Sequence, residues 1–535
     1  MIRKRFDGPA VGRAAALAAA ALMALALLPS AASAHAKLTR SEPRAKARLE
    51  QAPRLVELWF SDALAQGFST IEVTDAQGRR VDSGPVTHAE GDKKAQVGLQ
   101  ELGPGAYTVT YKVVSVDEHT IRGKFTFTVA EPAAGAAATS PTPAPTAEPQ
   151  AAGAAGRAAA TPTPEAAEAG AAQTETAGAE ESATTWVDNL VRWLAYLAMM
   201  TLLGGFAARL FVLGPALRRT RDAGEGAAEE AARVGARRAV SLLGAGLAVL
   251  VVTLLAALAL QSAAVNGVGV GEALSPALLG RVVTQTGYGR SWLFMGVAAA
   301  ALAVVVLALK RELKSSPPDG GRAWWWAGLA ASGLLLVGPS LTGHTMAAAR
   351  EHHFAVVSDW LHLAAGGFWV GGLFHLALTM PPSLAPLGPG QRTRALGWVI
   401  TLFTRVAVPS VVVVSLAGLY NSWIHLGSLG ALWGTPYGKT LLVKVLLVVP
   451  MVALGALNGF RFGPLAERLG AAGDEGERAR LERGFVRSLK AEAALGVLVL
   501  LVAAVLVFVT PGRNDAMEMT GGSPASPDAR AGGPK

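Results

Sequence analysis

The sequence predicts a multi-domain membrane protein in which a small β-sandwich is joined by a disordered tether to an all-α polytopic bundle of eight helices. Short segments that alternate apolar and polar residues are found in the first 130 residues. Eight long apolar segments follow Trp186, and an Ala- and Pro-rich stretch separates the two regions. With 51% hydrophobic residues and a mean hydropathy of +0.36, the 535-residue chain is too apolar for a purely soluble protein.

Residues 1–34 have the pattern of a secretory signal peptide. A basic start at residues 3–5 precedes an apolar run at residues 14–28, and Ala-Ser-Ala at residues 32–34 is an A-x-A cleavage site. Cleavage after this site would leave His35 as the first residue, with a free α-amine beside its imidazole. The amine nitrogen and Nδ1 could then close a six-membered chelate on one metal ion, a geometry that suits Cu(II).

Four segments between residues 35 and 130 alternate as half-buried strands do. They are Val56–Phe60, Thr70–Thr74, Tyr107–Tyr111 and Lys124–Val129. Turn signals such as Gly103-Pro104-Gly105 separate them. Because the chain has no cysteine, the sheet core must hold this domain without disulfides, and thiolate metal sites are excluded.

A possible partner for His35 is the pair formed by Asp117 and His119. These residues are two apart, so in extended backbone their side chains leave the same face of the strand. One carboxylate oxygen and one imidazole nitrogen could complete a square plane around a metal held by His35. Nitrogen and oxygen ligands in such a plane favour Cu(II), with Ni(II) as the second choice.

These residues give the region 35–130 a resemblance to the CopC-type periplasmic copper-binding domains. The matching stretches are His35-Ala36, Ser41-Glu42-Pro43, Val56–Ser61, Gly105–Val109, Asp117, His119 and Gly123. The resemblance implies a Greek-key β-sandwich that binds Cu(II) through His35, Asp117 and His119. One departure is Glu118, where the family usually carries Gly. The family's Met-rich Cu(I) site has no counterpart, because residues 35–130 contain no Met.

Residues 131–185 contain few large apolar residues and are expected to form the disordered tether. The expected membrane domain covers residues 186–512, and an exported disordered tail follows at 513–535. The eight candidate spans have about 20 residues each. They lie approximately at 187–213, 239–260, 291–309, 324–343, 355–378, 401–425, 440–460 and 491–510.

The distribution of Lys and Arg between these spans predicts the topology. The four loops that an exported first domain would place inside the cell hold 19 Lys and Arg residues, whereas the outer loops hold 4. This difference places the β-domain and the C-terminal tail on the periplasmic or extracellular side of the cell membrane. The net charge of +9 therefore indicates membrane topology and not a nucleic-acid surface.

Histidines near the outer end of the membrane domain are candidates for a transport path. His344 and Met346 follow the fourth expected span, and Asp359 and His362 open the fifth. Asp359 and His362 are three residues apart and share a helix face. His375 lies 13 residues beyond His362, about 20 Å along a helix axis. Ionisable residues at such depths are costly, which makes them candidates for function.

The second half of the chain resembles the CopD-type copper-resistance membrane proteins. The matching residues are His344, Asp359-Trp360-Leu361-His362, Trp369–Leu373, Asn421, Tyr437-Gly438-Lys439, Lys444, Asn458, Arg487 and Glu492. Fusion of the two halves resembles fused copper proteins linked to copper acquisition. The resemblance therefore implies that the exported domain collects Cu(II) and that the membrane domain moves copper into the cell.

Copper and the lipid bilayer are thus the expected partners, and the protein is not expected to be an enzyme. No G-x-x-x-x-G-K-[ST] phosphate loop occurs in the sequence, so a nucleotide is not an expected partner. Nucleic acid is not expected either, because the basic residues lie mostly in loops between apolar spans. Other roles for a copper protein are tolerance, sensing or export. Two further alternatives are a copper-dependent oxidative enzyme with an N-terminal histidine brace, and a haem protein with His344 and His362 as axial ligands.

Overall fold

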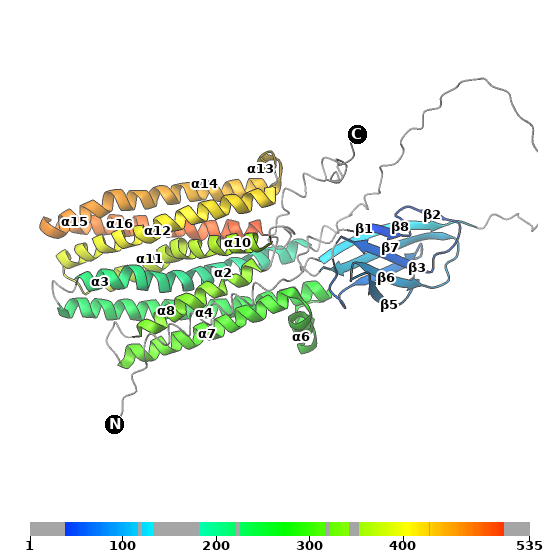
Figure 1. Ribbon diagram of the computed structural model, residues 1–535, viewed down its shortest axis with the longest axis horizontal. Helices are drawn as coiled ribbons and strands as arrows, with labels where there is room; N and C mark the ends of the chain where they lie inside the picture. Colours follow the sequence, from blue (N-terminus) through cyan, green and yellow to red (C-terminus); the bar gives the residue numbers. More distant parts are fainter. Residues whose placement is uncertain are drawn as a thin grey trace, which may run out of the picture. The chain divides into compact units, whose positions relative to one another are not determined.

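The computed structural model describes two compact units. The β-domain lies within residues 35–177 and the helical unit within residues 178–535 (Figure 1). The expected signal peptide, most of the tether and the C-terminal tail lie outside the described residues. The structure describes residues 38–61, 63–115, 120–131, 181–220, 225–315, 321–341, 352–426 and 428–507.

The β-domain consists of two four-stranded sheets, with strand orders β1-β3-β6-β5 and β2-β8-β7-β4. Strands β2 and β8 pair in parallel, and the other described neighbours pair antiparallel. The predicted β-sandwich is therefore present, while its Greek-key connectivity stays a prediction. The strands are β1 (Leu38–Glu42), β2 (Arg48–Leu49), β3 (Leu55–Phe60), β4 (Thr70–Asp75), β5 (Asp82–Ala89), β6 (Lys94–Leu99), β7 (Gly105–Val114) and β8 (Thr120–Val129).

The alternating residues of both sheets form one apolar core. Val56, Leu58 and Phe60 of β3 point into it, as the sequence pattern predicts. Tyr107 stacks on Phe127 with ring centroids 5.4 Å apart. Full burial of a side chain such as Phe127 contributes about 1.5–3 kcal/mol to the stability of the domain.

The helical unit contains long helices, three of which are continued by short π-helical segments. The π-helical segments are η1 (Ala208–Leu213), η4 (Gly367–Gly371) and η5 (Asn458–Phe462). The α-helices are α2 (Glu181–Ala207), α3 (Gly214–Thr220), α4 (Glu225–Asn266), α5 (Val270–Ala273), α6 (Pro276–Gln285), α7 (Gly287–Ser315), α8 (Arg322–Leu335), α9 (Val337–Ser340), α10 (His352–Gly366), α11 (Gly372–Leu384), α12 (Pro389–Leu426), α13 (Ala431–Gly434), α14 (Pro436–Leu457), α15 (Gly463–Ala472) and α16 (Glu475–Leu506).

Seven helical stretches in the described part of the chain are long and apolar enough to cross a membrane. The expected fourth span, 324–343, corresponds to α8 and α9, and its last residues lie outside the described ranges. A bundle of eight spans therefore stays a prediction. The seven candidates are Trp186–Thr220, Gly226–Asn266, Gly287–Lys314, Phe354–Leu384, Pro389–Leu426, Pro436–Ala471 and Glu475–Leu506.

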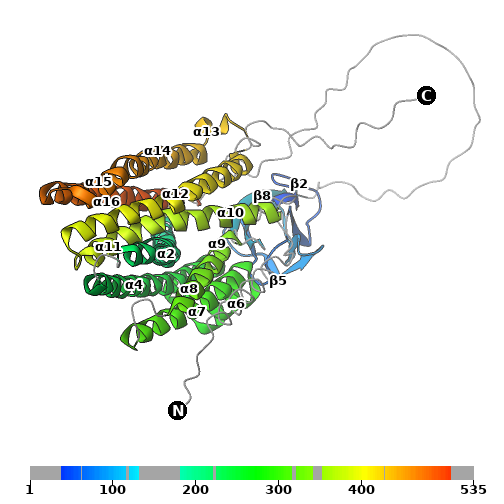
Figure 2. The same ribbon diagram turned by 60° about the vertical axis from the view of Figure 1, so that its left-hand side comes forward.

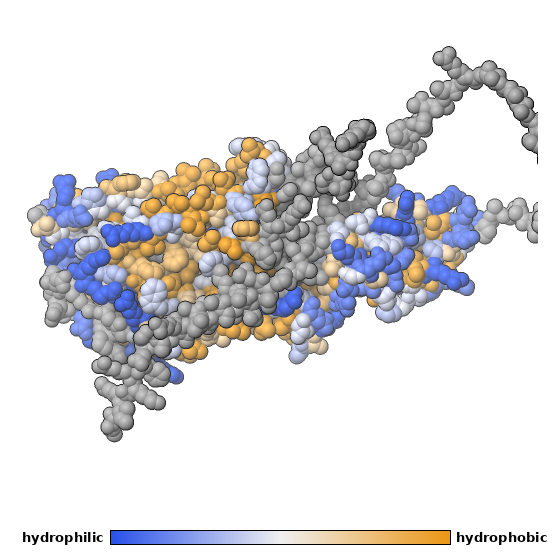
Figure 3. All heavy atoms as spheres, viewed as in Figure 1, coloured by the Kyte–Doolittle hydropathy of each residue, from blue (hydrophilic) through white to orange (hydrophobic). Residues whose placement is uncertain are grey.

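Helix α2 lies in the centre of the unit, where it packs against α4, α8, α11 and α16 (Figure 2). A Cβ atom added to Gly204 of α2 would collide with the backbone of Gly371. These glycines let the two helices approach closely, as small residues do in membrane bundles. Apolar side chains cover the outer surface of the unit, and polar residues gather at the end that carries α3 and α15 (Figure 3).

Candidate functional site

The three predicted copper ligands of the β-domain, His35, Asp117 and His119, lie outside the described residues. The strands beside them are well defined. Residues 116–119 connect β7 to β8, whose ends pair as Val114 with Thr120. His35 precedes β1 by three residues. The metal-ligand set therefore stays a prediction. The structure shows where the strands that flank the predicted ligands lie.

The start of β1 and the end of β7 lie at the same end of the β-domain. Leu38 of β1 pairs with Phe60 of β3, and the Phe60 ring lies 6.0 Å from that of Tyr111 in β7. Four residues after Phe60, Leu64 forms a bridge with Ser115, the last described residue before the 116–119 connection. The segments that carry the predicted ligands therefore leave the sheets from neighbouring positions.

His88 is the imidazole of the β-domain that lies among the described residues. Its Nε2 is 2.9 Å from Ser69 Oγ, and its Nδ1 is 3.9 Å from Asp92. Burial lowers the pKa of His88, and the Asp92 carboxylate opposes that shift. Among the described residues of the whole chain, no group of three or more His, Asp and Glu side chains is placed to hold a metal ion.

In the helical unit, polar side chains meet around Asp359 of α10. Ser340 of α9 donates a hydrogen bond of 2.7 Å to Asp359 Oδ2. His425 of α12 and Lys444 of α14 lie close enough to Asp359 to interact with it electrostatically. We call Ser340, Asp359, His362, His425 and Lys444 the Asp359 cluster. These residues come from four helices, α9, α10, α12 and α14, in a region of apolar spans.

His362 faces α12, and its Nδ1 lies 3.1 Å from the carbonyl oxygen of Val414. That distance assigns the proton to Nδ1, because only an N–H can donate to a carbonyl. Nε2 then carries the lone pair, which is the tautomer that can bind a metal. His344 and Met346, the predicted outer partners of His362, lie outside the described residues.

His375 of α11 faces a different side of the bundle. It lies beside Gly205 of α2, and Leu243 of α4 lies beside the same glycine. The side chain is only 1% exposed, and neither ring nitrogen has a hydrogen-bond partner among the described residues. The structure therefore does not place His362 and His375 on one helix face, although both belong to the same candidate span.

A second buried polar group, to which the sequence analysis assigned no role, surrounds Glu492 of α16. Asn458 Nδ2 donates a hydrogen bond of 3.0 Å to Glu492 Oε2, and Trp369 also hydrogen-bonds this carboxylate. We call Trp369, Asn458 and Glu492 the Glu492 cluster. The signal was visible in the sequence, since Glu492 is a carboxylate at the start of an apolar span.

Comparison with known proteins matches three family models. They are the CopC domain at residues 38–130, the copper resistance protein D-like N-terminal domain at 183–352, and copper resistance protein D at 397–506. The chain is 26% identical to the copper transport protein CutJ of Bacillus subtilis over 488 residues, which cover 90% of this chain and 76% of CutJ.

Two further relatives match smaller parts of the chain. Protein YobA of Escherichia coli K12 is 35% identical over 113 residues, which cover 21% of this chain and 91% of YobA. Copper resistance protein D of Pseudomonas syringae pv. tomato is 29% identical over 231 residues, which cover 43% of this chain and 71% of that protein.

The fold and the apolar spans define a multi-pass membrane protein that carries a β-sandwich domain. The chain belongs to the copper transport and resistance family in which a CopC domain is joined to a CopD domain.

Proposed function

We propose that this protein acquires copper, with the exported β-domain binding Cu(II) and the membrane domain moving copper into the cell. The observation that carries the proposal is the similarity of 90% of the chain to a protein named as a copper transport protein. The proposed Cu(II) ligands are His35, Asp117 and His119, with the β-domain and the C-terminal tail outside the cell. No enzymatic step is part of the proposal.

The membrane half would carry copper past His362 and His375, with Asp359, His344 and Met346 at the outer end. Imidazole and thioether groups suit copper, whereas a site of carboxylates alone would suit Mg²⁺ or Ca²⁺. The Nε2 lone pair of His362 and the two unpartnered nitrogens of His375 support this assignment. His362 faces α12, whereas His375 faces α2. Copper would therefore move from one side of the helix formed by α10 and α11 to the other.

The membrane potential can drive this movement. An inside-negative potential favours cation entry by about 2.3 kcal/mol per charge per 100 mV. A passive path of this kind needs no nucleotide, in agreement with the lack of a phosphate-loop motif in the sequence.

A copper tolerance or export role is the second candidate, because another relative is named copper resistance protein D. Cellular copper content at limiting external copper distinguishes the two. Cells that make the protein should accumulate more copper than cells that lack it. Unchanged or lowered copper content would contradict acquisition and favour tolerance or export.

A further inference from the structure

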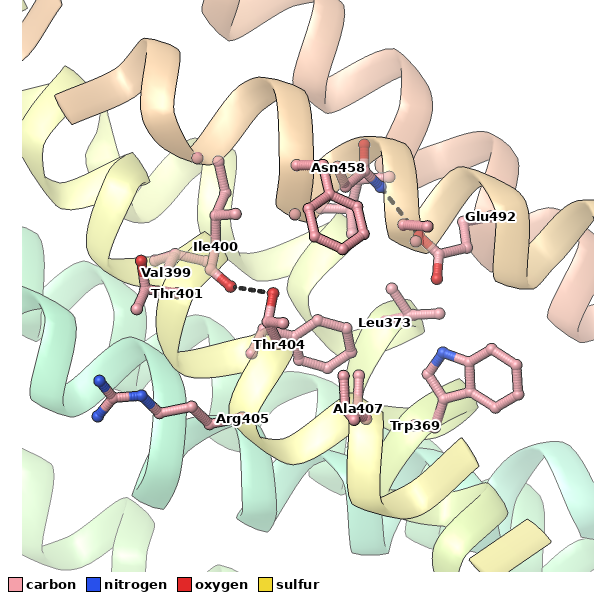
Figure 4. Close-up of a pocket in the computed structure, with 18 of the residues that line it drawn as sticks. Trp369, Leu373, Val399, Ile400, Thr401, Thr404, Arg405, Ala407, Asn458 and Glu492 are labelled. Atoms are coloured by element: carbon pink, nitrogen blue, oxygen red, sulfur yellow. Dashed lines mark hydrogen bonds between the residues drawn. The ribbon is translucent and has the colours of Figure 1, made fainter. Parts of the chain in front are cut away.

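A cavity of about 610 Å³ lies on the side of the helical unit, between α12 and the helix formed by α14, η5 and α15 (Figure 4). Its walls are mainly aliphatic and aromatic. Val408, Val412 and Phe460 line the cavity and are also exposed on the outer surface of the unit. Because these residues belong to candidate membrane spans, the cavity opens toward the lipid.

The cavity forms where α12 separates from its neighbour. A Cβ on Gly463 would lie 3.6 Å from Ile400, and a Cβ on Gly459 would lie 3.6 Å from Thr404 Oγ1. Helix α12 therefore packs closely against η5 and α15, but it touches α14 much less. Since these glycines already contact α12, they are not free to receive a helix of a second copy. The space between α12 and α14 stays open to the acyl chains of the lipid.

The lining of the cavity changes from polar to apolar along both walls. On α12, Thr401 and Arg405 come first, and Val408 follows one helical turn later. On the opposite wall, Glu467 lies in α15, whereas Val452 lies in α14. Polar residues of the unit gather at the end that carries α3 and α15 (Figure 3). The cavity is therefore polar toward this polar end and apolar toward the membrane interior, the order in which a phospholipid places its headgroup and acyl chains.

Arg405 is the charged group of the cavity that can meet a headgroup. It is exposed, and Figure 4 shows its side chain extending toward the Thr401 side of the cavity, away from Ala407. Long basic side chains in membrane spans direct their charge in this way toward the membrane–water interface. No described residue forms a hydrogen bond or an ion pair with Arg405. Its guanidinium is thus free to pair with a phosphate, which it can bind through two parallel hydrogen bonds.

The charges around this end favour an anionic lipid over a zwitterionic one. Glu467 is the only acidic residue of α12, η5 and α15, whereas four exposed arginines belong to these elements. The arginines are Arg394, Arg405, Arg461 and Arg468. Glu492 of α16 also lines the cavity, but it is 2% exposed and its carboxylate accepts a hydrogen bond from Asn458. The excess of positive charge attracts anionic headgroups.

We propose that this cavity binds one anionic phospholipid with the chemistry of phosphatidylglycerol. An acyl chain fills the apolar part beside Val408 and Val452, and the phosphate pairs with the guanidinium of Arg405 at the polar end. A volume of about 610 Å³ lies within the range of small-molecule sites, about 300–1,000 Å³. The site goes beyond the copper function and does not depend on it.

Native mass spectrometry of the full chain, purified in detergent and stripped of lipid, tests this proposal. The probes are phosphatidylglycerol and phosphatidylcholine with identical acyl chains, so that only the headgroup differs. We expect one phosphatidylglycerol per chain to bind first, with an affinity about fivefold or more above that of phosphatidylcholine. Equal affinity for the two lipids would overturn the proposal. Displacement of the lipid by excess glycerol 3-phosphate would also overturn it, because the phosphate alone would then suffice for binding.

One variant tests the headgroup contact. Arg405→Gln should weaken phosphatidylglycerol binding by about fivefold and leave phosphatidylcholine binding unchanged, because it removes the charge that distinguishes the two lipids. Arg238→Gln is the matched control, since Arg238 is an exposed arginine of α4, away from the cavity. An equal effect of the two substitutions would contradict a specific role for Arg405.

A second variant tests the acyl-chain contact. Ala456 lines the cavity and is exposed, so Ala456→Leu places bulk in open space and should weaken the binding of both lipids by about tenfold. Ala300→Leu at an exposed position of α7 is its control. Unfolding temperatures show whether each variant is folded.

Phosphatidylglycerol binding that survives both Arg405→Gln and Ala456→Leu would overturn the assignment to this cavity. A dimer that forms without lipid and is lost in Ala456→Leu would show that a second copy of the chain occupies the cavity instead. The measurement uses no copper, so its failure is distinguishable from failure of the proposed copper function.

Discussion

The β-domain and the helical unit place their polar side chains in opposite ways. Among the described residues, Ser41 and Ser115 are the polar residues of the β-domain that are buried as whole residues. The buried side chains of Asp82 and His88 have partners in Arg80 and Ser69. The helical unit buries Arg209, His375 and Glu492, among others, beneath an apolar surface (Figure 3). Water solvates polar groups at the surface of a domain, whereas lipid does not, so a membrane protein keeps them inside. The functional side chains of the helical unit are therefore expected in its interior.

Not every buried polar group of the helical unit is a functional candidate. Many hydroxyls, such as those of Thr201, Thr379 and Ser383, donate to the carbonyl four residues earlier in their own helix. These hydroxyls are satisfied locally and need no ligand. His375 and Asn458 Oδ1 differ, because the described residues provide no partner for them. The predictions below test this distinction, from the largest expected effect to the smallest.

The largest effect should come from His362→Ala. Copper uptake should fall to the background of cells without the protein, because the alanine removes the Nε2 lone pair from the proposed path. Cu(II) binding by the β-domain should be unchanged. His425→Ala is the control, since His425 is held by Asn421 O and stacks on Tyr437, and its effect should be mild. Uptake at the wild-type level in well-expressed His362→Ala would show that copper passes elsewhere.

The next largest effect concerns the β-domain. His35→Ala or His119→Ala should weaken Cu(II) binding on the order of 100-fold, and Asp117→Ala should weaken it less. One residue added before His35 should also weaken binding, because it moves the α-amine away from the imidazole. Competition titration on the isolated domain measures these changes. Unchanged Cu(II) affinity in the variant with the added residue would contradict a chelate formed by the α-amine and the imidazole of His35.

The variant His375→Leu tests whether the fully buried His375 side chain serves transport or packing. It should reduce uptake by about tenfold, which corresponds to about 1.4 kcal/mol of barrier. The unfolding temperature should be unchanged or higher, because an imidazole without hydrogen-bond partners is unfavourable in an apolar interior. If stability falls while uptake remains normal, the role of His375 is structural.

Asp359→Asn should have a smaller effect, a partial loss of uptake of about fivefold, which corresponds to about 1 kcal/mol. The asparagine can still accept the hydrogen bond from Ser340, but it loses the negative charge near His425 and Lys444. Initial uptake rates at several copper concentrations would measure the loss. A rate equal to wild type would exclude a role for this charge in the path.

The smallest expected effect is a pH dependence of the β-domain. Lys112 lies opposite Arg122 in the β7–β8 pair, and burial together with this positive charge lowers the pKa of Lys112 to about 8. The unfolded chain keeps a value of about 10.4 and so binds more protons than the folded domain between these pH values. Stability should therefore rise as pH increases from about 8 to about 10.4, on the order of 1 kcal/mol after allowance for solvent screening.

Urea unfolding of the isolated β-domain across this pH range measures the effect, and Lys112→Gln should flatten the increase. The β-domain can be studied alone, because it forms a compact unit of its own and matches the CopC domain model over residues 38–130. Equal pH dependence in the two proteins would contradict the assignment to Lys112.

The sequence predicted the regular parts of both units. The alternating segments became β3, β4, β7 and β8, because their apolar faces form the core. The sequence analysis did not predict β5 and β6 as strands. Strand β5 contains Gly84 and Pro85, and its register with β6 shifts between Ser83 and Thr87, which interrupts the period-2 pattern.

In the helical unit, apolar length predicted the seven candidate spans, but it could not predict local helix geometry. His362 and His375 are 13 residues apart, which at about 100° per residue places them on nearly opposite faces even of a regular helix. The π-helical segment η4 lies between them, and the apolar pattern of the sequence gives no sign of it. Glu492 is recognisable in the sequence as a carboxylate at the start of an apolar span, but its hydrogen-bond partners Trp369 and Asn458 come from two other helical segments and could not be predicted.

The most direct test of copper import is uptake of isotopically labelled copper by proteoliposomes that contain the purified full chain, with the β-domain facing outward. A potassium diffusion potential, negative inside, is imposed at limiting external copper. We predict entry of labelled copper that requires the potential and is absent with His362→Ala. No entry above protein-free vesicles, or movement only in the outward direction, would contradict the proposal that this protein imports copper.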